Sequence, residues 1–283
     1  MDDDARWRLL YLKKLEVEIA EAFGVLRNNG VEPLLIKGWA AARNYPVNVQ
    51  RFCADVDLAV SAADFEVADR LLRANPERKL CVDLHRELRH LDTRPWSEVF
   101  GDSREIDLNS ISIRIPADED HLRVLVVHWL NDGGERKDRL WDIYYAIQNR
   151  LPDFDWDLCL NSVSEVRRGW IVAVIGLANL YLGLDIDDLP FAARAKELPP
   201  WLVSALDKEW QSGVPLKSLH MCLSNPKELL RQIRKRIPPN PIQATIESEG
   251  SFDNRSRLKY QLASMVRKFG PSIKGIRKTL AQQ

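Results

Sequence analysis

The chain has 283 residues, and its 41 Lys and Arg balance its 41 Asp and Glu, so its formal net charge is zero. This balance excludes a globally basic nucleic-acid-binding protein, and the ordinary apolar content of 45% excludes a disordered chain. No apolar run is long enough to span a bilayer, and the acidic start, Met1-Asp2-Asp3-Asp4, is unlike a secretory signal. We therefore expect a cytoplasmic, globular protein with one large domain or two ordinary ones.

The cysteines give no sign of a metal cluster or a disulfide framework. They are widely spaced and form no Cys-x-x-Cys pair: Cys53, Cys81, Cys159 and Cys222. We expect single buried thiols in a reducing compartment.

The first predicted elements lead to a candidate phosphate-binding corner. Residues 5–29 carry apolar side chains at three- and four-residue steps, which predicts a helix, and residues 31–36 are expected to form a buried strand. Lys37-Gly38 then begins a short helix over residues 39–44. A helix N-terminus attracts phosphate oxygens, and glycine allows close backbone approach. A lysine that is simply exposed at a helix start would give the same pattern.

Two aspartates mark the next predicted strand, residues 56–60. Asp55 and Asp57 face the same way if the segment is extended, because side chains alternate across a strand. Such a pair can bind Mg²⁺, which prefers carboxylate, phosphate and water oxygens. Asp-x-Asp also occurs by chance, so the prediction of a metal site rests on its neighbours, the Lys-Gly corner and Arg51.

A third carboxylate is expected on a later strand, and two candidates compete. Residues 79–88 alternate between apolar and polar, which places Asp83 and His85 on one face. Asp107 lies in a second alternating stretch, residues 105–115. Because Asp107 precedes an Asn-Ser turn signal, we favour Asp83, although both stay open.

The order of these motifs resembles the polymerase β-type nucleotidyltransferase superfamily, and more narrowly a group of uncharacterised bacterial nucleotidyltransferases. The matching positions are Lys37, Gly38, Arg51, Asp55, Asp57, Asp83, His85, His128, Trp141 and Asp142. The resemblance covers about residues 34–147. It departs from the broader superfamily at the first turn, where Gly-Ser or Gly-Gly is usual and Lys-Gly stands here.

The resemblance implies an α+β fold, with an N-terminal mixed sheet and flanking helices followed by an all-helical domain. It also implies Mg²⁺-dependent transfer of a nucleoside monophosphate from an NTP, expected to be ATP, to a hydroxyl of a small molecule, a peptide or RNA. The implied catalytic and metal-binding residues are Asp55, Asp57 and Asp83. The implied nucleotide-binding residues are Lys37, Gly38, Arg51, His128 and Asp142. Hydrogen bonds between helices would explain His128 and Asp142 equally well.

From residue 117 onward the pattern is almost wholly helical, so we expect a catalytic domain over 1–116, a helical domain over 117–237, and a linker with a basic tail over 238–283. The tail could touch RNA, anionic lipid or an acidic partner, but the solvated face of a packed helix explains its charge more simply. The further expected helices cover 138–150, 156–164, 166–182, 201–212 and 225–237.

Two other functions are compatible with the same fold. One is a catalytically silent module that binds a nucleotide or a partner, and the other is a toxin-like transferase that modifies tRNA, for which the basic tail is the single supporting feature. A kinase of the aminoglycoside-phosphotransferase type is disfavoured, because no His-x-Asp catalytic loop followed by Asn and a second Asp is found. The nucleotide, the acceptor and the oligomeric state are not determined by the sequence.

Overall fold

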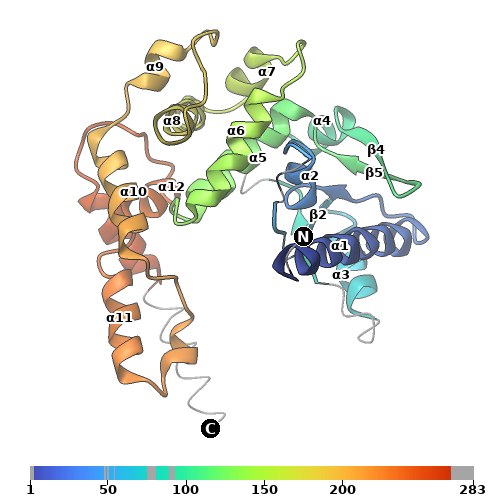
Figure 1. Cartoon of the computed structure of the whole chain (residues 1–283), viewed down its shortest axis with the longest axis horizontal. Helices are drawn as coiled ribbons and strands as arrows, with labels where there is room; N and C mark the ends of the chain where they lie inside the picture. Colours follow the sequence, from blue (N-terminus) through green and yellow to red (C-terminus); the bar gives the residue numbers. More distant parts are fainter. Residues whose placement is uncertain are drawn as a thin grey trace. The chain divides into compact units, whose positions relative to one another are not determined.

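The computed structural model describes residues 3–47, 49, 51–53, 55–74, 81–88 and 93–268. The chain divides into two compact units, of which the first holds residues 1–127 and 141–164, and the second holds residues 128–140 and 165–283 (Figure 1).

A three-stranded mixed sheet lies in the first unit. β2 is its central strand, with β1 antiparallel on one side and β3 parallel on the other. A separate antiparallel hairpin contains β4 and β5. The strands are β1 (Leu34–Leu35), β2 (Val56–Val60), β3 (Val82–Arg86), β4 (Arg104–Leu108) and β5 (Ile111–Ile115). Every residue of β2 is buried, as expected of a strand paired on both edges. The predicted strand over residues 56–60 is therefore confirmed.

Helices cover this sheet through one shared apolar core. The stripe predicted over residues 5–29 forms α1, in which Leu15, Ile19 and Phe23 are fully buried together with Leu58 and other sheet residues. Each such side chain stabilises the fold by about 1.5–3 kcal/mol. The helices that precede β5 are α1 (Asp3–Arg27), α2 (Trp39–Ala42), α3 (Phe65–Arg73) and α4 (Trp96–Gly101).

The first helices that follow the sheet lie in the same compact unit as the sheet. Most of α5 and α6, with α7, belong to the unit that holds the sheet, and the division falls within α5 after residue 127. Ion pairs explain this attachment, because Arg43 contacts Asp118 at 2.6 Å and Arg94 contacts Asp120 at 2.7 Å. A change in composition along the chain does not report such long-range contacts. These helices are α5 (Asp118–Asn131), η1 (Lys137–Arg139), α6 (Leu140–Gln148) and α7 (Trp156–Asn161).

The second unit is helical, and α8 is its buried core helix, as its apolar sequence predicts. Gly176 of α8 lies directly against the backbone of α9 at Ala195, where a Cβ atom would be only 1.9 Å from the carbonyl oxygen. Glycine at this position therefore permits the close approach of the two helices. The helices are α8 (Glu165–Leu182), α9 (Ala192–Lys196), α10 (Pro200–Ser212), η2 (Leu219–Cys222), α11 (Pro226–Arg236) and α12 (Pro241–Ile246), with residues 258–268 also helical.

The segment expected to be a linker, from residue 238 onward, contains a buried helix. Asn240 caps α12 by accepting hydrogen bonds from the N–H groups of Ile242 and Gln243, and Pro241 occupies the first helical turn. Asn and Pro are common both in linkers and at the start of a helix, and here they start a helix. Composition alone therefore suggested a linker.

Part of the basic tail makes polar contacts within the second unit. Lys268 forms an ion pair with Glu247 at 2.6 Å, and Arg267 donates to the carbonyl oxygen of the same residue. Other basic positions expected in the tail, Lys274, Arg277 and Lys278, lie outside the described residues.

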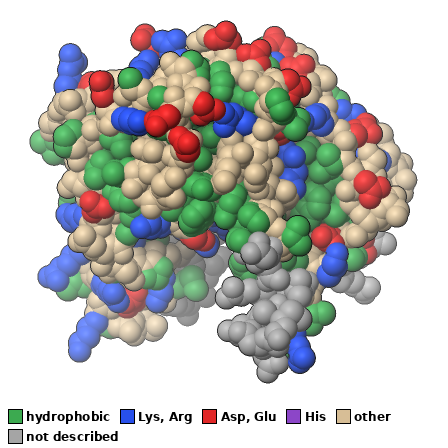
Figure 2. Space-filling model, turned by 45° about the horizontal axis from the view of Figure 1, so that its top comes forward, with side chains coloured by type: hydrophobic (Ala, Val, Ile, Leu, Met, Phe, Trp, Pro, Cys, Tyr) green, Lys and Arg blue, Asp and Glu red, His purple; other side chains and the backbone are tan. Residues whose placement is uncertain are grey.

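The α+β fold expected from the sequence is confirmed. Among the described residues, no helix combines the length and the apolar character required to cross a membrane. Acidic and basic side chains are interspersed on the face shown in Figure 2. All four cysteines are free, and Cys81 is exposed, contrary to the expectation of four buried thiols.

Candidate metal and nucleotide site

The parallel pairing of β2 with β3 brings two aspartates together. Asp57 and Asp83 are register partners, and His85 follows two residues later on the same face of β3. His85 Nε2 lies 3.2 Å from Asp83 Oδ2 and 3.6 Å from Asp57 Oδ1. One ligand atom from each of the three residues lies within 4.8 Å of the others, so these side chains can share a cation.

The Lys-Gly corner lies beside this group, as the sequence predicted. Lys37 Nζ is 2.7 Å from Asp57 Oδ1, and both side chains are buried. The N–H of Ile36 donates to the carbonyl oxygen of Asp57, which ties the end of β1 to β2. Gly38 has φ +59°, and a Cβ atom there would lie 3.7 Å from Asp57 Oδ2. The glycine therefore keeps the space next to the carboxylate open.

Asp57 is an anion despite its burial. Burial alone would raise its pKa, but the imidazole of His85 and the ammonium group of Lys37 outweigh that effect and hold the pKa of Asp57 below its ordinary value. Asp83, in contrast, has a side chain that is 59% exposed. The pair thus offers one fixed, buried carboxylate and one that solvent and ligands can reach.

Asp55 does not join the three residues that can share a cation. It is exposed and precedes β2, and its carbonyl oxygen lies 3.4 Å from the position of a Cβ on Gly38. The structure thus adds His85 to the candidate ligands, whereas the sequence indicated it only as a motif residue. Its position two residues after Asp83 in a strand was the signal that could have identified it.

Asp107 has a local role in the β4–β5 hairpin. Its Oδ1 accepts a hydrogen bond from the N–H of Ser110 at 3.1 Å. Asn109 and Ser110 both have positive φ, as a tight turn between these strands requires. The hairpin pairs separately from the sheet that carries Asp57 and Asp83.

Arg51 and Asp142 contact each other within the first unit. Both are buried, and two guanidinium nitrogens of Arg51 donate to the two carboxylate oxygens of Asp142 at 2.5 and 2.7 Å. The hydroxyl group of Tyr45 donates to the same carboxylate at 2.6 Å. Burial lowers the pKa of Arg51, but the carboxylate of Asp142 outweighs it and raises that pKa. This cluster joins the segment before β2 to α6, and binding of phosphate by Arg51 stays a prediction.

His128 belongs to the second unit and is 3.6 Å from Asp132, one helical turn later in α5. Its contact with a nucleotide or an acceptor stays a prediction.

The donor groups of the site fit a divalent cation. Two carboxylates suit Mg²⁺ or Mn²⁺, and an imidazole nitrogen adds affinity for later transition metals. The Lys-Gly corner at the end of β1 places one ammonium group beside these carboxylates.

The family comparison agrees with this chemistry. The model of a family described as uncharacterised nucleotidyltransferase matches residues 13–183, and the chain belongs to that family. No curated protein and no solved structure matches the chain.

Proposed function

We propose that the protein is a divalent-metal-dependent nucleotidyltransferase that moves a nucleoside monophosphate from an NTP, ATP being the first candidate, to a hydroxyl group. The observation that carries the proposal is the convergence of Asp57, Asp83 and His85 next to the Lys37-Gly38 corner. Family membership supports the general class of reaction.

Each residue has an assigned role in this proposal. Asp57 and Asp83 would hold Mg²⁺, and the exposed carboxylate of Asp55 stays a further proposed ligand. A bound divalent cation would neutralise charge on phosphate oxygens and make the acceptor hydroxyl more acidic. Lys37 and the N–H groups of the corner would bind the phosphates that leave as pyrophosphate.

The reaction forms one bond and breaks one bond. The acceptor oxygen attacks the α-phosphorus, and the bond from that phosphorus to the pyrophosphate oxygen breaks. The exposed carboxylate of Asp83 is the assigned proton acceptor for the hydroxyl group.

The test is incubation of the full chain with each α-labelled NTP and Mg²⁺ or Mn²⁺, in the presence of a cell extract or tRNA as the source of acceptors. Asp83→Asn should reduce label transfer by about 10²-fold or more, and because its side chain is exposed the variant should melt with the wild type. Asp107→Asn is the matched control, because it removes the competing carboxylate in the hairpin. Full activity of Asp83→Asn, or equal loss in both variants, contradicts the assignment.

A second candidate function is a silent nucleotide-binding module. The observation that favours it is the contact of Asp57 Oδ1 with Lys37 at 2.7 Å and with His85 at 3.6 Å, since a bound metal must compete with both side chains. Tight NTP binding without label transfer or pyrophosphate release, under all metals, would establish this alternative. Dependence of NTP binding on Mg²⁺ together with pyrophosphate release would exclude it.

A further inference from the structure

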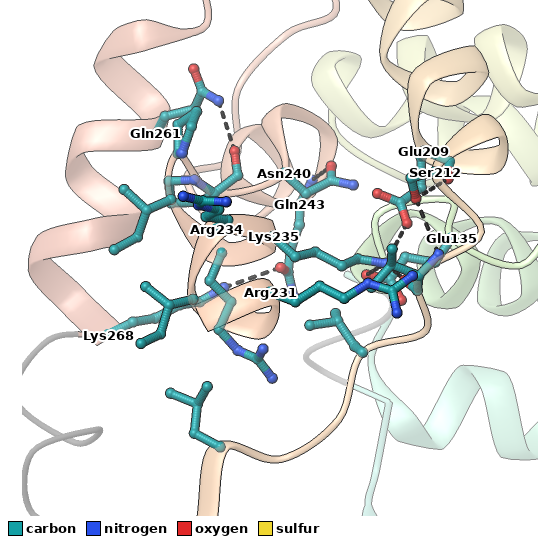
Figure 3. A pocket seen from close by; sticks show the side chains of 18 of the residues that line it. Glu135, Glu209, Ser212, Arg231, Arg234, Lys235, Asn240, Gln243, Gln261 and Lys268 are labelled. Atoms are coloured by element: carbon teal, nitrogen blue, oxygen red, sulfur yellow. Dashed lines mark hydrogen bonds and ion pairs between the residues drawn. The ribbon is translucent and has the colours of Figure 1, made fainter. Parts of the chain in front are cut away.

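The second unit contains a basic pocket that the nucleotide site does not use. It is lined by α10, the segment 214–219, α11, the turn 237–241 and the helical residues 258–268, with a volume of about 1240 Å³ (Figure 3). Sites for small molecules usually have about 300–1,000 Å³. The pocket is therefore large enough for a segment of a macromolecule.

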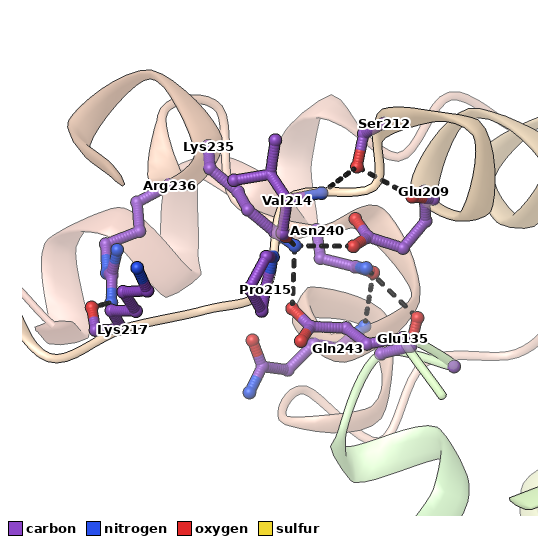
Figure 4. A network of polar contacts seen from close by, with 12 residues as sticks. Glu135, Glu209, Ser212, Val214, Pro215, Lys217, Lys235, Arg236, Asn240 and Gln243 are labelled. Atoms are coloured by element: carbon purple, nitrogen blue, oxygen red, sulfur yellow. Dashed lines mark hydrogen bonds and ion pairs between the residues drawn. The ribbon is translucent and has the colours of Figure 1, made fainter. Parts of the chain in front are cut away.

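The lining is strongly cationic although the chain as a whole is neutral. Nine Lys and Arg line the pocket against two glutamates, Glu135 and Glu209. Lys235 Nζ already forms ion pairs with both, at 3.8 Å from Glu135 Oε1 and 2.6 Å from Glu209 Oε1 (Figure 4). The side chains of Lys208 and Lys227, in contrast, are exposed and make no hydrogen bond or ion pair with any residue that the structure describes. Outside the lining, Glu228 pairs with Lys217 and Arg231, and Glu247 pairs with Lys268. The positive charge that no carboxylate of the described residues balances therefore includes that of Lys208 and Lys227.

Aliphatic side chains lie among these cations. Leu230 and Ile233 are three residues apart in α11 and therefore share one face, and Ile237 follows directly after the last residue of the helix. Together with Leu216, they line the pocket and remain 38–57% exposed. An apolar stripe with a cationic rim is typical of a surface that another chain covers.

The chemistry of the lining distinguishes among possible occupants. No aromatic side chain is among the lining residues, so unpaired bases would find no stacking surface in the described part of the pocket. The chain's own residues 269–283 contain Lys274, Arg277 and Lys278 and no Asp or Glu, so their charge does not complement the pocket. Aliphatic anchors with carboxylates on either side complement both features of the lining.

We propose that this basic pocket binds an acidic amphipathic polypeptide segment of a partner protein, with aliphatic residues on the Leu230–Ile237 stripe and carboxylates on the rim lysines. This site is separate from the proposed nucleotidyl transfer and does not depend on it.

The probe is a fluorescein-labelled peptide with Leu at helical positions i, i+3, i+4 and i+7 and Glu elsewhere. Binding to the full chain is followed by fluorescence anisotropy at low and high salt. Peptides of the same composition in scrambled order, the same pattern with Lys in place of Glu, and a labelled single-stranded RNA are compared. The variants are Lys208→Glu with Lys227→Glu for the rim, and Leu230→Ser with Ile233→Ser for the stripe. Lys259→Glu is the control, since Lys259 is exposed in the same unit but does not line the pocket.

The patterned acidic peptide should bind about tenfold or more tightly than the scrambled or the basic peptide. Both double variants should weaken this binding by about tenfold, while Lys259→Glu leaves it unchanged. Melting curves identify any variant that fails to fold, and the lysine double variant removes no side-chain hydrogen bond or ion pair among the described residues. Equal binding of the scrambled peptide, tighter binding of RNA at the same lysines, or self-association that Lys227→Glu abolishes would each overturn the proposal.

Discussion

Replacement of Gly38 by alanine tests whether the Lys-Gly corner shapes the site. Gly38 has φ +59° and ψ −110°, a conformation that residues with a side chain avoid and that is typical of one position in a type II′ turn. A Cβ atom would also lie 3.4 Å from the carbonyl oxygen of Asp55 and 3.7 Å from Asp57 Oδ2. The added Cβ would meet these atoms at ordinary contact distance, so the substitution acts mainly by straining the backbone of the corner beside Asp57.

The expected loss of stability follows from this conformation. Backbone strain of this kind costs about 1–3 kcal/mol. For a unit of about 150 residues, each kcal/mol lowers Tm by about 2–4 °C, so Gly38→Ala should melt about 2–12 °C below the wild type. Gly24→Ala is the matched control, because Gly24 lies in α1 with no atom within 4 Å of the new Cβ. Alanine there should raise stability by up to about 1 kcal/mol.

Calorimetric titration with Mn²⁺ and with NTP provides the second measurement. Gly38→Ala should weaken the binding of both ligands at a temperature where the variant is still folded, and Gly24→Ala should not. If Gly38→Ala melts with the wild type and binds Mn²⁺ and NTP equally well, the corner does not shape the site and the reasoning is refuted.

Three further predictions concern the packing and charges of the two units. Gly176→Ala should destabilise the second unit by about 1–3 kcal/mol or more, because α9 must move away from the new Cβ. The control is Gly169→Ala in the same helix, where the new Cβ meets one side-chain atom at 3.8 Å. This variant should be neutral or stabilising in thermal melts. Burial and the charge of Arg43 lower the pKa of His121 to about 3. Between about pH 6.5 and about 3 the unfolded state therefore binds more protons than the folded state, and this group lowers the free energy of unfolding by up to about 1.4 kcal/mol per pH unit as the pH falls. In urea titrations, the free energy of unfolding of His121→Gln should fall less steeply with pH than that of the wild type. Identical slopes would contradict the burial of a neutral His121. Asp142→Leu should cost about 3–5 kcal/mol in urea unfolding by leaving Arg51 buried without its partner, and most of that loss should be recovered when Arg51→Met is added. A small effect of the single variant would show that solvent reaches the pair.

Much of the candidate site was predictable because it depends on local patterns. Alternation along a strand is enough to place Asp83 and His85 on one face, and glycine after a buried strand indicated a sharp corner. The Asn-Ser turn signal likewise disfavoured Asp107, which the hairpin uses to hold its own turn. These features involve neighbours within a few residues, so their signals survive in the sequence.

The segment that begins at residue 238 shows where local signals were misread. Its prolines and asparagine suggested a linker, but Asn240 and Pro241 start a helix whose apolar residues are buried. A helix of six residues is too short to show a recognisable apolar period in the sequence, and its burial depends on helices elsewhere in the chain.

By itself, the sequence determined the central strand, the covering helix α1, the face shared by Asp83 and His85, and membership of a nucleotidyltransferase family. Only the tertiary structure decided that β3 pairs with β2, which places Asp83 beside Asp57, and that Lys37 contacts the carboxylate of Asp57. It also decided that cations from several helices line one basic pocket. The physical reason is the range of the interactions: periodicity and turn chemistry act between close neighbours, whereas strand register and ion pairing join residues that are distant in the chain and are fixed only when the core packs.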